Sequence, residues 1–138
     1  MRVFLDASAI IYLLEGDRQT REATRQVLGE LKRGSDETPV LMASALSRLE
    51  CRVRPLRESD TQALERLDGF FDDPGLSVIA LDTAALDRAT ELRAQYRLRT
   101  PDAIQAACLL KVDPRGAFVT GDGDFEKVPG LHVHRISH

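Results

Sequence analysis

The sequence is poor in cysteine and in aromatic residues, and it carries little net charge. Its 138 residues include two cysteines, Cys51 and Cys108, which are too few for a disulfide framework. Tryptophan is absent and aromatic residues make up 5%, so few side chains could stack on bases. A net charge of −3 argues against binding nucleic acid through bulk positive charge. The composition therefore disfavours a passive binding module for nucleic acid, but it leaves enzymes open.

Long hydrophobic runs are missing as well. No stretch approaches the ~20 apolar residues of a membrane-spanning helix, and the apolar run Val3 to Leu5 is too short for a signal peptide. We therefore expect a cytoplasmic protein without a membrane partner, in which both cysteines are reduced. The length lies near the ~150 residues typical of one domain, so residues 1–138 are predicted to form a single domain.

Short apolar runs alternate with helical patterns along the chain. Strands are predicted at residues 1–5, 40–42, 76–81, 117–120 and 131–133, with helices between them. Pro55 is expected to end the third helix, Asp82 to cap a later one, and the hydroxyl of Thr100 to cap the buried helix that follows. Parallel strands need crossover helices, so the pattern predicts an α/β fold, a three-layer α/β/α sandwich with a mostly parallel central sheet.

Acidic residues follow the predicted strands at the edge where ligands collect in such folds. Asp6 follows the first strand, and Asp122 and Asp124 follow the fourth. Asp102 lies in the first turn of the buried helix, and Glu50 lies at the margin of the apolar stripe formed by Leu46, Leu49 and Val53. Four separate segments thus direct a carboxylate toward one edge of the sheet.

Each acid also has an ordinary structural explanation. Asp6 could cap its helix, Asp102 could be a first-turn acid stabilised by the helix dipole, and Glu50 could pair with Arg54. Asp122 and Asp124 could be turn residues beside glycine. Their convergence argues for more, because clustered carboxylates repel one another unless a divalent cation lies between them. An all-oxygen site without a Cys/His cluster suits Mg²⁺ or Mn²⁺ better than Zn²⁺.

Four blocks of the sequence resemble the signature blocks of PIN-domain ribonucleases, and in particular the VapC-type toxins of bacterial toxin–antitoxin modules. The blocks are Leu5-Asp6-Ala7-Ser8, Ala43 to Glu50, Arg99 to Ala107, and Val119 to Phe125 with Pro129-Gly130-Leu131. The resemblance implies a PIN-like α/β/α fold, Mg²⁺- or Mn²⁺-dependent cleavage of RNA, a homodimer, and inhibition by a small cognate antitoxin protein.

The resemblance also assigns roles to residues of this chain. The implied catalytic acids are Asp6, Glu50, Asp102 and Asp122, and the implied metal ligands are the same four with Asp124. Ser8 and Thr120 match hydroxyl neighbours of the site, whereas Gly121 stands where many members have a polar side chain. Asp122 is favoured over Asp124 because it is nearer the strand end, and the choice between one and two metal ions stays open.

The resulting hypothesis is hydrolysis of an RNA phosphodiester, in which a divalent cation activates water and neutralises the scissile phosphate. Arg48, Arg52 and Arg99 are candidates to attract the substrate, although surface ion pairs are an equal explanation. The histidines, His132, His134 and His138, all lie in the tail and are interpreted as non-catalytic.

Two other functions remain as alternatives. One is a catalytically inactive PIN-like binding module. The other is a haloacid-dehalogenase-type phosphatase, which is disfavoured because that chemistry needs an acid where Ser8 stands. Apolar surface for an antitoxin helix or for self-association could come from the helix around residues 10–14 or from Val27, Leu28 and Leu31, although core packing is the commoner use of such residues.

Overall fold

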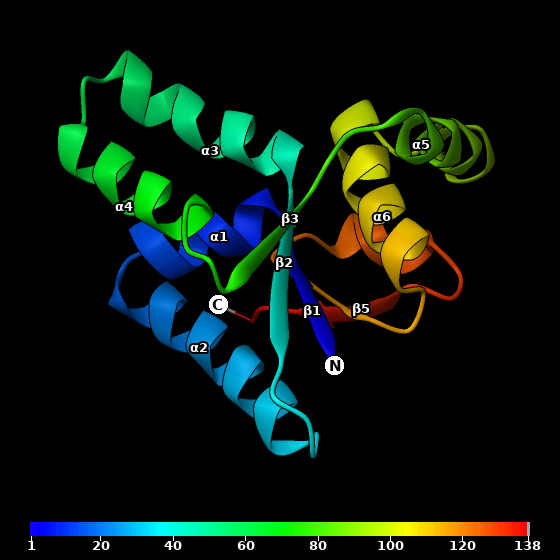
Figure 1. Ribbon diagram of the computed structural model, residues 1–138, viewed down its shortest axis with the longest axis horizontal. Coiled ribbons are helices and arrows are strands. Elements are labelled where there is room, and N and C mark those ends of the chain that lie inside the picture. The colour runs from blue at the N-terminus through cyan, green and yellow to red at the C-terminus, as the bar shows by residue number, and fades with distance from the viewer. Residues whose placement is uncertain (138) are drawn as a thin grey trace.

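Over residues 1–137, which the computed structural model describes, the chain forms five strands and six α-helices in three layers (Figure 1). His138 lies outside the described residues. The elements in chain order are β1 (Arg2–Leu5), α1 (Ala7–Glu15), α2 (Arg18–Arg33), β2 (Val40–Ser44), α3 (Ala45–Arg57), α4 (Thr61–Phe71), β3 (Leu76–Ile79), α5 (Thr83–Tyr96), α6 (Thr100–Val112), β4 (Ala117–Thr120), the 3₁₀ helix η1 (Gly123–Lys127) and β5 (His132–Arg135). The predicted α/β class with a parallel central sheet is confirmed.

The strand order β3-β2-β1-β4-β5 determines where a site can form. All neighbouring strands are parallel, and the chain runs outward from β1 through β2 to β3 before it crosses to β4 on the other side of β1. The direction of winding therefore reverses between β1 and β4. Ligands of open α/β sheets bind beyond the carboxyl ends of the strands at such a reversal, so the expected location is just past Leu5 and Thr120.

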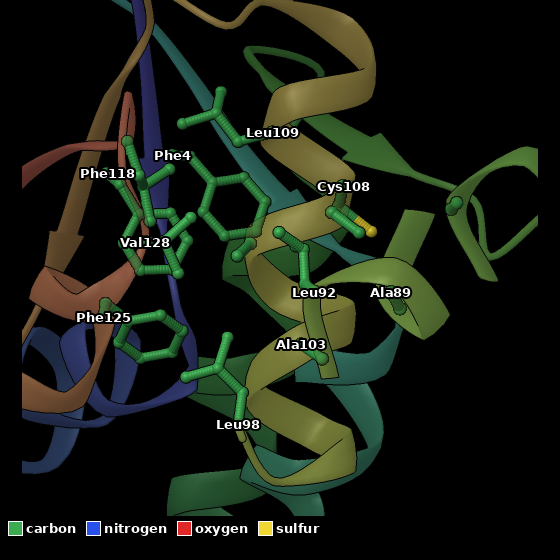
Figure 2. Close-up of a cluster of buried hydrophobic side chains, with 14 of the residues drawn as sticks. Phe4, Ala89, Leu92, Leu98, Ala103, Cys108, Leu109, Phe118, Phe125 and Val128 are labelled. Carbon is green, nitrogen blue, oxygen red and sulfur yellow. The ribbon is translucent and has the colours of Figure 1, made fainter. Parts of the chain in front are cut away.

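Helices α1 to α4 cover one face of the sheet, and α5 and α6 cover the other (Figure 1). Side chains alternate along β1. Val3 and Leu5 enter the first core, which lies between the sheet and α1 to α4, while Phe4 enters the second core, between the sheet and the pair α5 and α6. Phe4 stacks on Phe118 of β4 with ring centroids 5.2 Å apart, and these rings pack among Leu92, Leu109 and other side chains of the second core (Figure 2). This packing anchors α6, which carries Asp102, against the sheet.

Three local predictions about helices are wrong. Pro55 does not end the third helix; it is buried inside α3, which continues to Arg57. Thr100 is not the cap of α6, because Arg99 occupies that position and makes no capping bond with its side chain. On α3 the buried residues are Ser47, Cys51 and Pro55, whereas Leu49 and Val53 are exposed. The helix is thus rotated relative to the expected apolar stripe, because Ser47 turns inward to accept a hydrogen bond from Gln105 of α6.

Other local predictions are confirmed. Asp82 caps α5 by accepting a bond from the backbone of Ala85. α6 is buried over most of its surface, and β5 is a short strand at the sheet edge. Among the described residues, no helix is both long and apolar enough to cross a membrane.

Candidate functional site

Asp6 lies where β1 ends and α1 begins, and it performs two tasks. Its Oδ1 atom caps α1 by accepting a bond from the backbone N–H of Ala9 at 2.9 Å, and it accepts a second from the hydroxyl of Ser8 at 2.7 Å. Its Oδ2 atom accepts a bond from Thr120 Oγ1 of β4 at 2.6 Å. The capping role and a role in the site are therefore compatible, and the two hydroxyls hold the carboxylate in one orientation.

The electrostatic environment of Asp6 is unfavourable for a bare carboxylate. The residue is 4% exposed, and burial raises the pKa of its carboxyl above 3.8. The bonds from Thr120, Ser8 and Ala9 act in the opposite direction, while the negative charge of Asp102 raises this pKa further. Among residues 1–137, no side chain of positive charge forms an ion pair with Asp6 to offset its burial.

The loop after β4 is shaped by the same hydroxyls. Thr120 Oγ1 accepts a bond from the N–H of Asp122 at 3.0 Å, and Ser8 Oγ accepts one from Gly121 at 3.0 Å. A β-carbon at Gly121 would overlap the ring of Tyr12, which explains why this position has no side chain. Asp122 then caps η1 by accepting a bond from the N–H of Asp124 at 2.9 Å.

These turns bring three carboxylates together. One oxygen from each of Asp102, Asp122 and Asp124 lies within 4.8 Å of the other two. Asp102 is buried, Asp122 is half-buried and Asp124 is exposed, so the group opens toward solvent on one side. Three closely spaced carboxylates without Cys or His suit a hard divalent cation such as Mg²⁺ or Mn²⁺, which prefers oxygen ligands. The donor set therefore fits the predicted metal.

Arg99 and Lys127 already contact this group, and Lys127 Nζ lies 4.0 Å from Oδ1 of Asp124. Arg99 donates from Nε to Oδ2 of Asp102 at 3.0 Å. This bond raises the pKa of the guanidinium, and the negative charges of Asp102, Asp122 and Asp124 add to the effect. Of the three candidate arginines, Arg99 therefore contacts the acidic group directly.

The other two arginines lie elsewhere. Arg48 and Arg52 form ion pairs with Asp68, and Arg48 also pairs with Asp72. These pairs join α3 to the end of α4, so they account for both side chains without an RNA substrate. Of the two explanations that the sequence left open for Arg48 and Arg52, surface ion pairs are the one that these contacts support.

Glu50 does not belong to the three-carboxylate group, and it does not pair with Arg54. Arg54 instead forms an ion pair with Glu58, at 3.1 Å. Glu50 accepts a hydrogen bond from Nε2 of Gln105 on α6, at 3.0 Å. Burial, with smaller contributions from the charges of Glu50 and Asp6, raises the pKa of the neighbouring Cys51 thiol to about 12. Two of the predicted acids thus act on one thiol, which places Glu50 on the α3 side of the same region.

Sequence reasoning missed two residues of this region, Gln105 and Tyr12. Gln105 did leave a signal, because it is a polar residue three positions after Asp102 in a helix that is otherwise apolar at Ala103, Ala106 and Ala107. No signal in the sequence indicated Tyr12, because its contact with Gly121 joins two segments that lie far apart along the chain.

Comparison with known proteins identifies the family of the chain. Residues 3–131 match the PIN domain family, so the chain belongs to that family. No curated protein sequence matches the chain.

Similar solved structures are the VapC toxins of VapBC toxin–antitoxin complexes. A structure of VapBC2 from Rickettsia felis, bound to a DNA fragment from the promoter, has a TM-score of 0.77 at 16% identity and covers 99% of this chain and 100% of that one. A toxin–antitoxin complex from Klebsiella pneumoniae has a TM-score of 0.74 at 22% identity, covering 99% and 98%. VapC20 from Mycobacterium tuberculosis, described as a toxin that cleaves the sarcin-ricin loop, has a TM-score of 0.74 at 16% identity, covering 96% and 98%. At these identities the likeness establishes the fold.

Proposed function

We propose that this PIN domain is a metal-dependent endoribonuclease that hydrolyses RNA phosphodiester bonds and acts as the toxin of a toxin–antitoxin pair. The observation that carries the proposal is the meeting of Asp102, Asp122 and Asp124 within 4.8 Å. This group lies beside the strand end that holds buried Asp6, at the reversal of the sheet order. An acidic site of this kind has little structural purpose unless a cation neutralises it.

Asp102, Asp122 and Asp124 would hold Mg²⁺ or Mn²⁺ together with Asp6 and Glu50, which would bind the ion or its waters. When bound, the ion supplies positive charge that activates water and neutralises the phosphate of the substrate. Asp6 keeps its orientation through Ser8, Ala9 and Thr120. Asp122 is the better direct ligand, because it is less exposed than Asp124 and its Oδ1 atom orders the loop that carries Asp124. The exposed side of the group leaves room for an RNA backbone.

Arg99 provides the positive charge for attracting that backbone. Its side chain is 73% exposed although it touches Asp102, so it can turn from the carboxylate to a phosphate without unfolding α6. Arginine suits this task because its planar guanidinium donates to phosphate oxygens in pairs.

An antitoxin protein would bind the groove between α1 and the α3–α4 pair. This groove has a volume of about 600 Å³, and its lining combines the apolar Ile11, Leu14 and Pro55 with charged side chains that include Glu50. A helical segment of a partner could lay its apolar face there and extend toward the acidic group. Val27, Leu28 and Leu31 pack in the core beneath α1 to α4, which is the commoner use that the sequence analysis gave for them. The expected homodimer has an apolar surface available in the exposed residues Leu49, Val53 and Leu56 of α3.

The test measures metal binding and cleavage separately. The wild-type protein should bind Mn²⁺ in calorimetry and cut single-stranded or structured RNA only when Mn²⁺ or Mg²⁺ is present. Asp102→Asn and Asp122→Asn should weaken the binding and abolish cleavage, whereas Asp87→Asn, an exposed acid of α5, should change neither. Metal binding without cleavage of any RNA would favour the inactive binding module. Absence of both would overturn the proposal.

A further inference from the structure

Gln105 is a buried amide in the middle of α6 that uses all of its hydrogen-bond donors. The residue is 2% exposed. Its Nε2 atom donates to Ser47 Oγ at 2.8 Å and to Glu50 Oε1 at 3.0 Å, and its Oε1 atom accepts from Ser44 Oγ at 2.9 Å. An amide nitrogen has two hydrogens, and both are engaged here.

The orientation of this amide is determined by its neighbours. An ionised Glu50 carboxylate can only accept, so the NH₂ group of Gln105 must face it. Ser44 is itself fixed, because its Oγ accepts a bond from the N–H of Ser47 as the cap of α3. The carbonyl of Gln105 therefore meets a hydroxyl that the start of α3 holds in place. The three bonds form one network that leaves the amide a single orientation.

This network ties α3 to α6 at the level of the site. Asp102 and Gln105 lie three positions apart on α6, so they share one face of that helix. Asp102 belongs to the three-carboxylate group, while Gln105 holds Glu50 of α3. The distance between Glu50 and the carboxylate group is thus set through α6.

We propose that Gln105 is a positioning residue that fixes the Glu50 carboxylate relative to Asp102 and so preorganises the acidic site for a divalent cation. The inference rests on the proposed function. A carboxylate on an exposed margin of a helix samples several rotamers, and ordering it costs conformational entropy each time a cation binds. Because the buried amide orders Glu50 when the protein folds, this entropy is not lost again when a cation binds. Groups that orient metal ligands in this manner typically change metal affinity by 10- to 100-fold when they are removed.

The test is a double-mutant cycle between Gln105→Met and Glu50→Ala, read by Mn²⁺ calorimetry and by RNA cleavage. Methionine keeps the shape of glutamine but removes its donors. Gln105→Met should lower Mn²⁺ affinity by about tenfold in the wild-type background. In the Glu50→Ala background the same substitution should have no further effect, because the group through which Gln105 acts is gone. If the role of Gln105 were merely structural, Gln105→Met would instead lower Mn²⁺ affinity equally in both backgrounds, and that result would overturn the inference.

Two further variants keep the experiment decisive. Ser47→Ala removes one acceptor of the Gln105 amide without touching Glu50, and it should lower Mn²⁺ affinity by a smaller factor. Thr24→Val removes a buried hydroxyl bond on α2, a helix that carries none of the acidic residues of the site, and should lower stability while leaving Mn²⁺ affinity unchanged. Wild-type affinity in both Gln105→Met and Ser47→Ala would contradict the inference. A wild-type protein that binds Mn²⁺ but cuts no RNA would overturn the proposed function and still allow the Gln105 test.

Discussion

Arg99 and Asp102 form an ion pair across the first turn of α6, with Nε and Oδ2 3.0 Å apart, at the mouth of the acidic group. The guanidinium therefore offsets part of the negative charge where we propose that a divalent cation binds. Because both cations compete for the same carboxylate, this pair makes a measurable prediction about metal affinity.

Replacing Arg99 with glutamine should strengthen Mn²⁺ binding by about threefold, as expected for loss of an exposed pair. The same change should weaken RNA binding, because a phosphate contact is lost, and calorimetry with a fluorescent RNA assay can measure both effects. Arg88→Gln is the matched control, since Arg88 forms an equivalent i,i+3 pair with Glu91 on α5. Equal metal affinities in the wild type and Arg99→Gln would contradict this prediction.

Asp6→Asn should abolish metal-dependent cleavage while preserving the fold, because asparagine can still accept the capping bond of α1. Without metal, the variant should melt at a higher temperature than the wild type near pH 7. Burial raises the pKa of Asp6, so the folded state binds its proton more tightly than the unfolded state does. The stability due to this group is therefore present below pH 3.8, the ordinary value, and declines as pH rises through the folded-state pKa.

The measurement is the difference in melting temperature between wild type and Asp6→Asn across a pH series. The difference should grow with pH through this window, and Mn²⁺ should reduce it at neutral pH by stabilising only the wild type. Asp87→Asn should follow the wild type throughout. A variant with full RNase activity would refute the assignment of Asp6.

Two glycine substitutions should have opposite effects on stability. Gly121→Ala should destabilise by about 1–3 kcal/mol, because the new methyl group overlaps Tyr12 beside the site. Gly69→Ala should stabilise by about 0.5–1 kcal/mol, because it lies inside α4 and its new methyl group meets nothing. Urea unfolding measures both free energies of unfolding, and a stabilising Gly121→Ala would contradict the packing described here.

Both cysteines should resist alkylation in the folded protein. Burial raises the pKa of Cys51 to about 12 and that of Cys108 to about 11. At pH 8 the reactive thiolate is then a very small fraction of each, roughly one part in a thousand or less. Iodoacetamide should label neither thiol quickly until urea unfolds the chain, as mass spectrometry would record. Rapid labelling of the native protein at pH 8 would contradict the burial of these side chains.

Much of the fold was predictable because its signals are local. Apolar runs mark the strands, and Asp60 and Asp82 cap helices through bonds to residues three positions ahead. The orientation of α3 was not predictable in this way. Leu49 and Val53 form an apolar stripe that the structure leaves exposed, while Ser47 faces inward because Gln105, far along the chain, binds it.

The sequence alone determined the alternation of strands and helices, and it determined that acids follow the strands, because periodicity and caps act over a few residues. Only the tertiary structure decided which of these acids meet. Asp102 joins Asp122 and Asp124, whereas Glu50 joins Gln105, and Arg48 and Arg52 turn away to Asp68. The physical reason is that side-chain pairing depends on how α3 and α6 are rotated against the sheet. That rotation is set by contacts between segments that lie far apart in the sequence.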